Sequence, residues 1–309
     1  MLKQHQTAGF DLPHLLPDNK IRRMLSSSVK NRLGNAIDIP PQPPIYLQYW
    51  DEKYFNLNQV SIFNDASLEE KQKILHLCNL FLLEEAYFIE KAGVGYMSKM
   101  VSLAESFEER MLYALFSGDE VTHLTQISKF LPTPEIVGTN NSFLRFLADL
   151  IETDDKVVLL FILQVVLEGW GLTHYRNLAN TCQDSELATI FKSFLQEESR
   201  HHAAGTTFFS DYFVSFSSEA TIIEALQLFL TMVRVGPQGV VAAVEFVKGH
   251  LSPQQKVQIF AQLDTQTHSG SRLVLLRSLI DNPNSATILE ELDTRGLFQP
   301  LNPQQCLIC

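Results

Sequence analysis

The sequence is poor in cysteine and in basic residues, and each shortage excludes a class of protein. Only 4 of the 309 residues are cysteine, and their scattered positions are not those of a disulfide-stapled secreted domain. Lys and Arg number 24 against 35 for Asp and Glu, which gives a net charge of −11. This balance disfavours nucleic acid as a partner, because phosphate binding needs a clustered basic surface. It equally disfavours adsorption to an anionic membrane.

The sequence also lacks an evident signal peptide or membrane span. The first ten residues contain no apolar core of the kind that signal peptides have. The longest apolar run, 157–167, contains Gln164 and is shorter than the roughly 20 residues needed to cross a bilayer. We therefore expect a cytoplasmic protein with no transmembrane segment. A less favoured alternative is that the basic, serine-containing stretch 20–33 is part of an organelle transit peptide.

Proline is absent from two long windows, 45–131 and 135–236. Proline interrupts helix interiors, and no segment shows the period-two alternation of a half-buried strand. The sequence therefore predicts an all-α fold. Ser67 and Ser106 are each followed by Glu three residues later, a spelling typical of helix starts. With apolar residues at helical spacing, these signals predict helices over 67–103, 107–130, 142–152, 153–180, 186–204, 219–234, 238–249, 253–263, 265–281 and 284–294.

The same proline positions and helix-start patterns predict three consecutive segments. Residues 1–55 form an N-terminal arm with a linker at the Pro-rich stretch 40–44. Residues 56–210 form the domain with the chemically informative residues. Residues 211–309 form an additional helical region that packs on it, with a short tail.

Two Glu-x-x-His pairs carry the strongest chemical signal in the chain. They are Glu120/His123 and Glu198/His201, and residues three apart lie on one face of a helix. A further Glu lies 30 residues before each pair, Glu90 before the first and Glu168 before the second. Each pair alone is better explained by a surface Glu beside a His whose hydrogen bonds are satisfied.

The shared spacing changes that interpretation. The midpoints of the two 30-residue intervals, residues 105 and 183, fall at predicted breaks between helices. In an antiparallel hairpin, residues equidistant from the turn lie side by side, here ~22 Å from it at 1.5 Å per residue. Gly93 and Gly171 follow the two leading Glu residues at the same offset. We interpret the two stretches as a weak internal repeat, two hairpins related by pseudo-twofold symmetry.

If the two hairpins pair, four carboxylates and two imidazoles would lie at the same level along the helices. This donor set suits two metal ions bridged by carboxylates, and it matches the helical pattern of one Glu from each of two helices and Glu-x-x-His from the other two. The candidate metal ligands and catalytic residues are Glu90, Glu120, His123, Glu168, Glu198 and His201. Glu84 and Glu85 are alternatives to Glu90 for the first helix.

The string Glu-Glu-Ser-Arg-His at 197–201 is similar to a motif common in ferritin-like di-metal carboxylate proteins. This superfamily includes the ribonucleotide reductase small subunit, acyl-carrier-protein desaturases and related N-oxygenases. The resemblance covers about residues 67–204 and implies a ferritin-like four-helix bundle with one crossover through 131–153. The first motif departs from the pattern, because no Arg precedes His123.

The resemblance implies an oxidoreductase that uses two iron ions, one of which manganese could replace, with O₂ as co-substrate. A small, partly apolar substrate would undergo hydroxylation, desaturation or N-oxygenation. We expect an external electron donor of the reductase or ferredoxin type, because no Gly-rich dinucleotide fingerprint is present. A homodimer is compatible with the extra C-terminal helices. The alternatives are a ferroxidase or metal-handling protein and a non-catalytic helical interaction protein.

Several further residues have two interpretations each. The two glycines either leave room for dioxygen or substrate beside the metals or allow close helix packing. Two tyrosines near the leading Glu residues either donate electrons or pack in the core. Two additional histidines are either extra ligands or supporting groups. An acidic residue in an apolar run lines a pocket, and two C-terminal cysteines fit prenylation or a Cys-x-x-Cys pair. The glycines are Gly93 and Gly171, the tyrosines are Tyr87 and Tyr175, and the histidines are His174 and His202. The acidic residue is Glu245, and the cysteines are Cys306 and Cys309.

Overall fold

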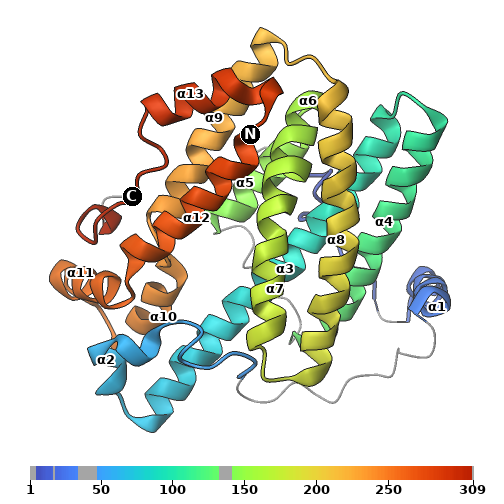
Figure 1. Cartoon of the computed structure of the whole chain (residues 1–309). Coiled ribbons are helices and arrows are strands. Elements are labelled where there is room, and N and C mark those ends of the chain that lie inside the picture. The colour runs from blue at the N-terminus through green and yellow to red at the C-terminus, as the bar shows by residue number, and fades with distance from the viewer. Residues whose placement is uncertain (1–4, 17, 34–46, 132–140, 308–309) are drawn as a thin grey trace. The chain divides into compact units, whose positions relative to one another are not determined.

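The computed structural model describes the whole chain except residues 1–4, 17, 34–46, 132–140 and 308–309 (Figure 1). Within the described residues every regular element is a helix and none is a strand. The prediction of an all-α protein is therefore confirmed. The chain divides into two compact units. Unit 1 comprises residues 1–44 and 82–156, and unit 2 comprises residues 45–81 and 157–309.

Unit 1 is built around a helical hairpin. The long helix α3 (Leu68–Leu103) begins in unit 2 and ends in unit 1, where α4 (Phe107–Ile127) follows it. The two helices run antiparallel, since Ser98 lies 3.2 Å from Ser117 and Glu90 lies 3.0 Å from His123. Helices α1 (Lys20–Leu33) and α5 (Ser142–Ile151) complete the unit.

Both predicted serine caps are present, but they differ in their partners. At Ser67 the capping box is reciprocal, with the Glu70 backbone donating to the Ser67 hydroxyl and the Ser67 backbone donating to the Glu70 carboxylate. Ser106 accepts from the Glu109 backbone. The Glu109 carboxylate instead accepts from the backbone of residue 105 and forms a 2.8 Å ion pair with the buried Lys156.

Unit 2 contains the second hairpin. Its first arm is a continuous helical stretch, α6 (Lys156–Leu159), then η4 (Leu160–Glu168), then α7 (Gly169–Thr181). Lys156 belongs to unit 1 and the remainder to unit 2. Asp184 caps the second arm, α8 (Ser185–Asp211), by accepting from the Leu187 backbone. The two arms run antiparallel, since Tyr175 stacks on Phe191 and the Gln164 side chain lies 3.1 Å from the carbonyl oxygen of His201.

The segment η4 is a π-helix, which is wider than an α-helix and is often found at functional sites. It coincides with the apolar run noted in the sequence, and its residues from Leu160 to Val166 are all buried. Gln164, the one polar residue in that stretch, has no exposed surface. Glu168 is the last residue of the π-helical segment.

The C-terminal helices of unit 2 build a second apolar centre. They are α9 (Phe216–Arg234), α10 (Gln238–Lys248), α11 (Pro253–Gln262), α12 (Thr265–Ile280) and α13 (Ala286–Thr294). Helix α9 packs against both α12 and α13. A cluster that includes Phe63, Ile74, Val244, Phe260 and Cys306 joins α10 and α11 to α2 (Ser61–Asn64) and to the start of α3. Lys248 ties α10 to α3 through a 2.8 Å ion pair with Glu70.

Helix boundaries follow the sequence prediction to within a few residues, with three differences. Helix α8 continues to Asp211, past the predicted end at 204. The stretch 20–33, expected to be part of an arm, is the helix α1. The predicted helix over 153–180 begins at Lys156 and contains the π-helix. The Pro-rich stretch 40–44 lies outside the described residues, and the three consecutive segments remain a prediction.

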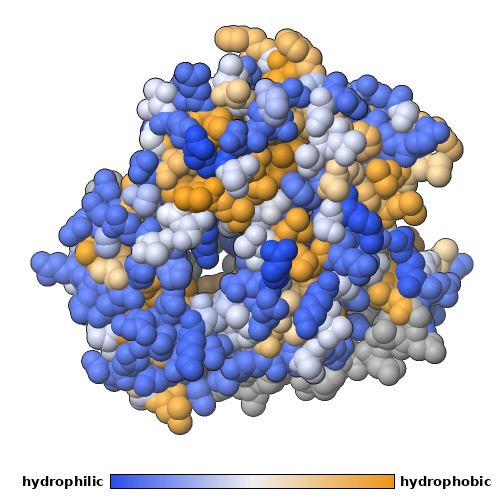
Figure 2. All heavy atoms as spheres, viewed as in Figure 1, coloured by the Kyte–Doolittle hydropathy of each residue, from blue (hydrophilic) through white to orange (hydrophobic). Residues whose placement is uncertain are grey.

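Several large apolar side chains of unit 2 are exposed, among them Phe213, Phe216 and Phe246. Figure 2 shows apolar atoms gathered at the junction of α8 and α9 on the displayed face. By length and composition alone, the stretch Lys156–Thr181 and helix α9 meet the criteria for a membrane span. Core helices of soluble proteins meet the same criteria, and 56% of the qualifying window in Lys156–Thr181 is buried.

Candidate metal centre

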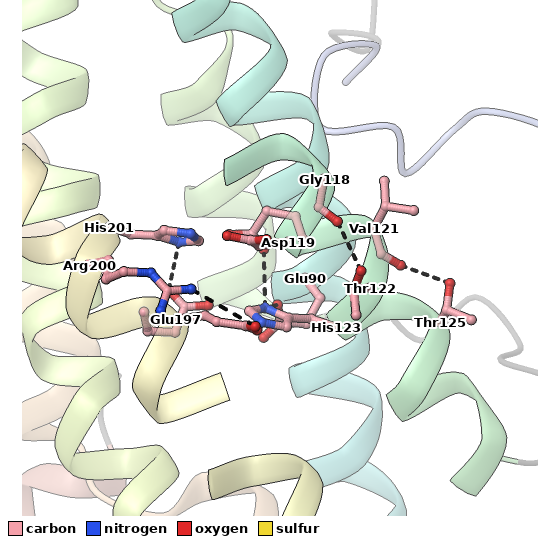
Figure 3. A network of polar contacts seen from close by, with 12 residues as sticks. Glu90, Gly118, Asp119, Val121, Thr122, His123, Thr125, Glu197, Arg200 and His201 are labelled. Atoms are coloured by element: carbon pink, nitrogen blue, oxygen red, sulfur yellow. Dashed lines mark hydrogen bonds and ion pairs between the residues drawn. The ribbon is translucent and has the colours of Figure 1, made fainter. Parts of the chain in front are cut away.

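Unit 1 brings three of the predicted ligands together. Glu90 comes from α3, and Glu120 and His123 come from α4, where they lie one turn apart on the same face. The Nδ1 atom of His123 lies 3.0 Å from Oε2 of Glu90 and 3.9 Å from Oε2 of Glu120 (Figure 3). All three side chains are buried, with exposed fractions of 4% or less. We call this set the first triad.

Unit 2 brings the other three predicted ligands together. Glu168 lies at the end of η4, and Glu198 and His201 lie one turn apart on α8. The Nδ1 atom of His201 is 3.3 Å from Oε2 of Glu198. One donor atom from each of the three residues lies within 4.8 Å of the others. Glu198 and His201 are buried and Glu168 is half-buried. We call this set the second triad.

An acidic residue precedes the motif Glu in both triads, and each pairs with an arginine. Asp119 forms a 3.1 Å ion pair with Arg32 of α1. Glu197 lies 4.0 Å from Arg200, which is one turn further along α8 and is exposed. Figure 3 shows Asp119 near His123, and Glu197 and Arg200 near His201. Each pairing gives the neighbouring carboxylate a cationic partner, so the Arg that is missing before His123 has a counterpart in Arg32.

The remaining face of α4 carries local hydrogen bonds. The hydroxyl groups of Thr122 and Thr125 donate to the backbone carbonyls of Gly118 and Val121, four residues earlier (Figure 3). These bonds satisfy both hydroxyl donors within the helix.

The alternatives for the first helix lie elsewhere. Glu85 accepts a 2.8 Å hydrogen bond from Asn141 at the start of α5. Glu84 is buried but is not among the residues whose donor atoms gather with Glu120 and His123. The structure thus groups Glu90, rather than these two neighbours, with the Glu-x-x-His pair of α4.

The two glycines have different surroundings, which corrects the interpretation that treats them alike. A Cβ on Gly93 would lie 2.7 Å from Cδ of Glu120, so the candidate ligand already fills the space beside it. At Gly171, no described atom beyond its own helix and chain neighbours lies within 4 Å of the Cβ position. Only the second glycine therefore leaves open space; the first accommodates a carboxylate.

The two tyrosines are packed among aromatic rings. Tyr175 stacks on Phe191 and meets Phe194 edge-on. Tyr87 meets the ring of Phe88 edge-on, and burial raises the pKa of its hydroxyl above the usual value. This is the core-packing alternative, and electron donation by either ring stays a prediction.

The additional histidines have partners outside the triads. His174 stacks on Trp170, and burial, with a smaller contribution from Arg272, lowers its pKa to about 4. The Nδ1 atom of His202 lies 2.8 Å from the backbone carbonyl oxygen of Gln164. A carbonyl oxygen only accepts hydrogen bonds, so this nitrogen carries the proton. Among the described residues, neither histidine belongs to a group of candidate ligands.

The remaining flagged residues are accounted for by local contacts. Glu245 forms a 2.7 Å ion pair with Lys256 and accepts from the Leu251 backbone, and these hydrogen bonds lower its pKa. Cys306 is 1% exposed and belongs to an apolar cluster, which disfavours prenylation at this thiol. Cys309 lies outside the described residues.

Sequence reasoning missed the supporting role of Gln164. Its side-chain Nε2 donates a 3.1 Å hydrogen bond to the backbone carbonyl of His201. The only signal was a single amide in an otherwise apolar run, which indicates a buried polar group that must find a partner.

Comparison with known proteins returned no match to any family model. No curated protein and no solved structure matches the chain either.

Proposed function

We propose that the chain is a di-metal oxidoreductase that uses O₂, with the two triads as its metal ligands. The observation that carries this proposal is the duplication of one donor set. In each hairpin a Glu from one arm meets a Glu-x-x-His pair from the other, at buried or half-buried positions. Isolated buried carboxylates are costly unless they are paired or bound to a metal. Two such sets in one chain favour metal binding over a coincidental arrangement of polar groups.

The donors fit iron. Carboxylate and imidazole are ligands of divalent iron and manganese, and no thiolate belongs to either triad. Bound iron would supply the electrons with which dioxygen is activated. The residues of the chain do the rest. Four carboxylates balance the positive charge of two divalent ions, the imidazoles complete the coordination, and burial limits the access of water.

We further propose that the two hairpins pair into one four-helix bundle, so that the triads form a single dinuclear centre. This step rests on the repeated spacing of Glu, Gly, Glu and His in the sequence and on the general pattern of such bundles. Loading the protein with Mn²⁺ and recording electron paramagnetic resonance tests it. Magnetically coupled ions support one centre, whereas two independent mononuclear signals contradict it.

The substrate that this proposal favours is small and partly apolar. The π-helical segment that ends at Glu168 consists mainly of aliphatic and aromatic residues. A Cβ at Gly171 would have no described atom within 4 Å beyond its own helix and chain neighbours. The reaction is hydroxylation, desaturation or N-oxygenation. Electrons come from a separate protein donor, and the cytoplasm, where thiols stay reduced, suits a chain without a disulfide among its described cysteines.

The test is anaerobic loading with ferrous iron, followed by air. Two iron ions per chain and oxygen uptake that ceases in the double variant His123→Ala/His201→Ala support the proposal. Oxygen uptake that only deposits ferric iron, in proportion to the iron added and beyond two per chain, would replace it with the ferroxidase alternative. Metal below half an equivalent per chain would refute both and leave the helical interaction protein.

A further inference from the structure

We propose that Gln164 and His202 are positioning residues that lock the register of η4 against α8 and thereby align the second triad. This inference rests on the proposed function, because it concerns how Glu168 is held beside Glu198 and His201. It assigns no ligand role to either residue. Both act through the backbone of the segments that carry the ligands.

The two residues make a reciprocal pair of hydrogen bonds. The Gln164 side chain donates to the backbone carbonyl of His201 at 3.1 Å. The His202 side chain donates to the backbone carbonyl of Gln164 at 2.8 Å. Each helix therefore offers a side chain to the backbone of the other, and any sliding of one past the other breaks both bonds.

Two glycines allow the helices to approach closely enough for these bonds. A Cβ on Gly205 of α8 would overlap the Cβ of Gln164 and lie 3.2 Å from its Cδ. A Cβ on Gly169, the residue after Glu168, would lie 2.8 Å from Cε1 of His202. The close approach thus flanks the second triad on both sides, at Gln164 four residues before Glu168 and at Gly169 one residue after it.

The π-helical winding explains why a lock is needed. A π-helix is rare because α-winding is the more stable alternative for most segments. Reverting one wide turn to α-winding shifts the following residues by one position, which rotates them by about 100° around the helix axis. Such a rotation would carry the Glu168 carboxylate away from Glu198 and His201. The Gln164 and His202 bonds hold the middle of η4 against α8, and the His202 ring lies against Gly169 at its end. Because η4 is held on both sides of Glu168, these contacts oppose such a rotation.

Two variants that each remove one of the hydrogen bonds test whether these bonds hold the register of η4 against α8. A third, conservative variant tests whether an alternative donor restores the function of His202. Gln164→Met keeps the volume and removes the amide donor. His202→Phe keeps a ring and removes the Nδ1 donor, whereas His202→Asn retains an amide donor near the same position. The matched control is Ser269→Ala, which removes a buried 3.0 Å hydrogen bond from α12 to the Val233 carbonyl of α9. The control costs a buried hydrogen bond of the same kind, between two helices that carry none of the six candidate ligands.

The readout is Co²⁺ binding by equilibrium dialysis, with the visible spectrum of the bound ion. The parent protein binds two ions. In Gln164→Met and His202→Phe one ion stays tight, and the other binds about 10- to 100-fold more weakly, the range found when supporting groups around metal ligands are removed. His202→Asn and Ser269→Ala keep both ions and the parent spectrum.

The outcomes separate the two proposals. Fewer than two ions in the parent protein overturns the proposed function, and the lock with it. Two tight ions with the parent spectrum in both Gln164→Met and His202→Phe overturn the lock alone. A loss of the second ion in Ser269→Ala also overturns it, because any loss of stability would then have the same effect.

Discussion

The contrast between Gly93 and Gly171 gives a prediction in which stability and metal affinity change in opposite directions. Both glycines lie inside helices, where replacement by Ala stabilises the folded state by about 0.5–1 kcal/mol if the site has room. At Gly171 no described atom beyond its own helix and chain neighbours lies within 4 Å of the new methyl group. Gly171→Ala should therefore raise the free energy of unfolding by that amount and leave metal binding intact.

Gly93→Ala places the same methyl group 2.7 Å from Cδ of Glu120. The atoms it meets are the far end of a flexible side chain, so the helix keeps its position and the Glu120 carboxylate rotates away. The metal-free protein should then keep most of the propensity gain. The first triad should lose affinity by about 10- to 100-fold, as when the support of a metal ligand is disturbed.

Urea denaturation of the metal-free proteins and Co²⁺ dialysis of the same samples measure the two effects. The expected pattern is one weakened ion in Gly93→Ala and two tight ions in Gly171→Ala, with neither variant less stable than the parent. If both variants bind two ions equally well, Glu120 is not a ligand. If Gly93→Ala destabilises the metal-free protein by several kcal/mol, the carboxylate cannot move as argued.

Three further predictions concern the rest of the chain. The His174 pKa of about 4 lies below its usual 6.5, so the unfolded chain takes up the proton first, and the free energy of unfolding should fall by up to about 3 kcal/mol between pH 6.5 and 4. His174→Phe should flatten this dependence in urea titrations, and an unchanged slope would contradict it. Burial raises the Cys78 pKa to about 12, so iodoacetamide at pH 8 should modify Cys78 only after unfolding; rapid modification of the native protein, seen by mass spectrometry, would contradict its burial. Ser106→Ala should cost about 1 kcal/mol because the α4 cap is lost, and a thermal melt that matches the parent would show that another group caps α4.

The sequence predicted the helices and the grouping of the six candidate ligands into two sets because both depend on local spacing. The Ser67 capping box and the Glu-x-x-His pairs are patterns within one helical turn. The 30-residue intervals place each leading Glu beside its Glu-x-x-His pair if the turn of each hairpin lies at the midpoint of the interval. The observed contacts of Glu90 with His123 and of Tyr175 with Phe191 agree with turns near residues 105 and 183.

Features that depend on contacts between helices were not predictable from these patterns. The π-helical winding of η4 leaves no mark on apolar periodicity, and Gln164 looked like an interruption of an apolar run. Gly93 and Gly171 occupy matching positions in the repeat, yet only the structure shows that Glu120 fills the space beside the first. The Glu109 carboxylate matched a capping box but pairs with Lys156, a residue 47 positions later.

Metal stoichiometry tests the central claim most directly. Metal-free protein is incubated anaerobically with excess ferrous iron, desalted and analysed for iron and protein. We predict about two iron ions per chain in the parent and about one in each of the single variants His123→Ala and His201→Ala. Less than half an equivalent in the parent, or no change in either variant, would contradict the assignment of the two triads as metal ligands.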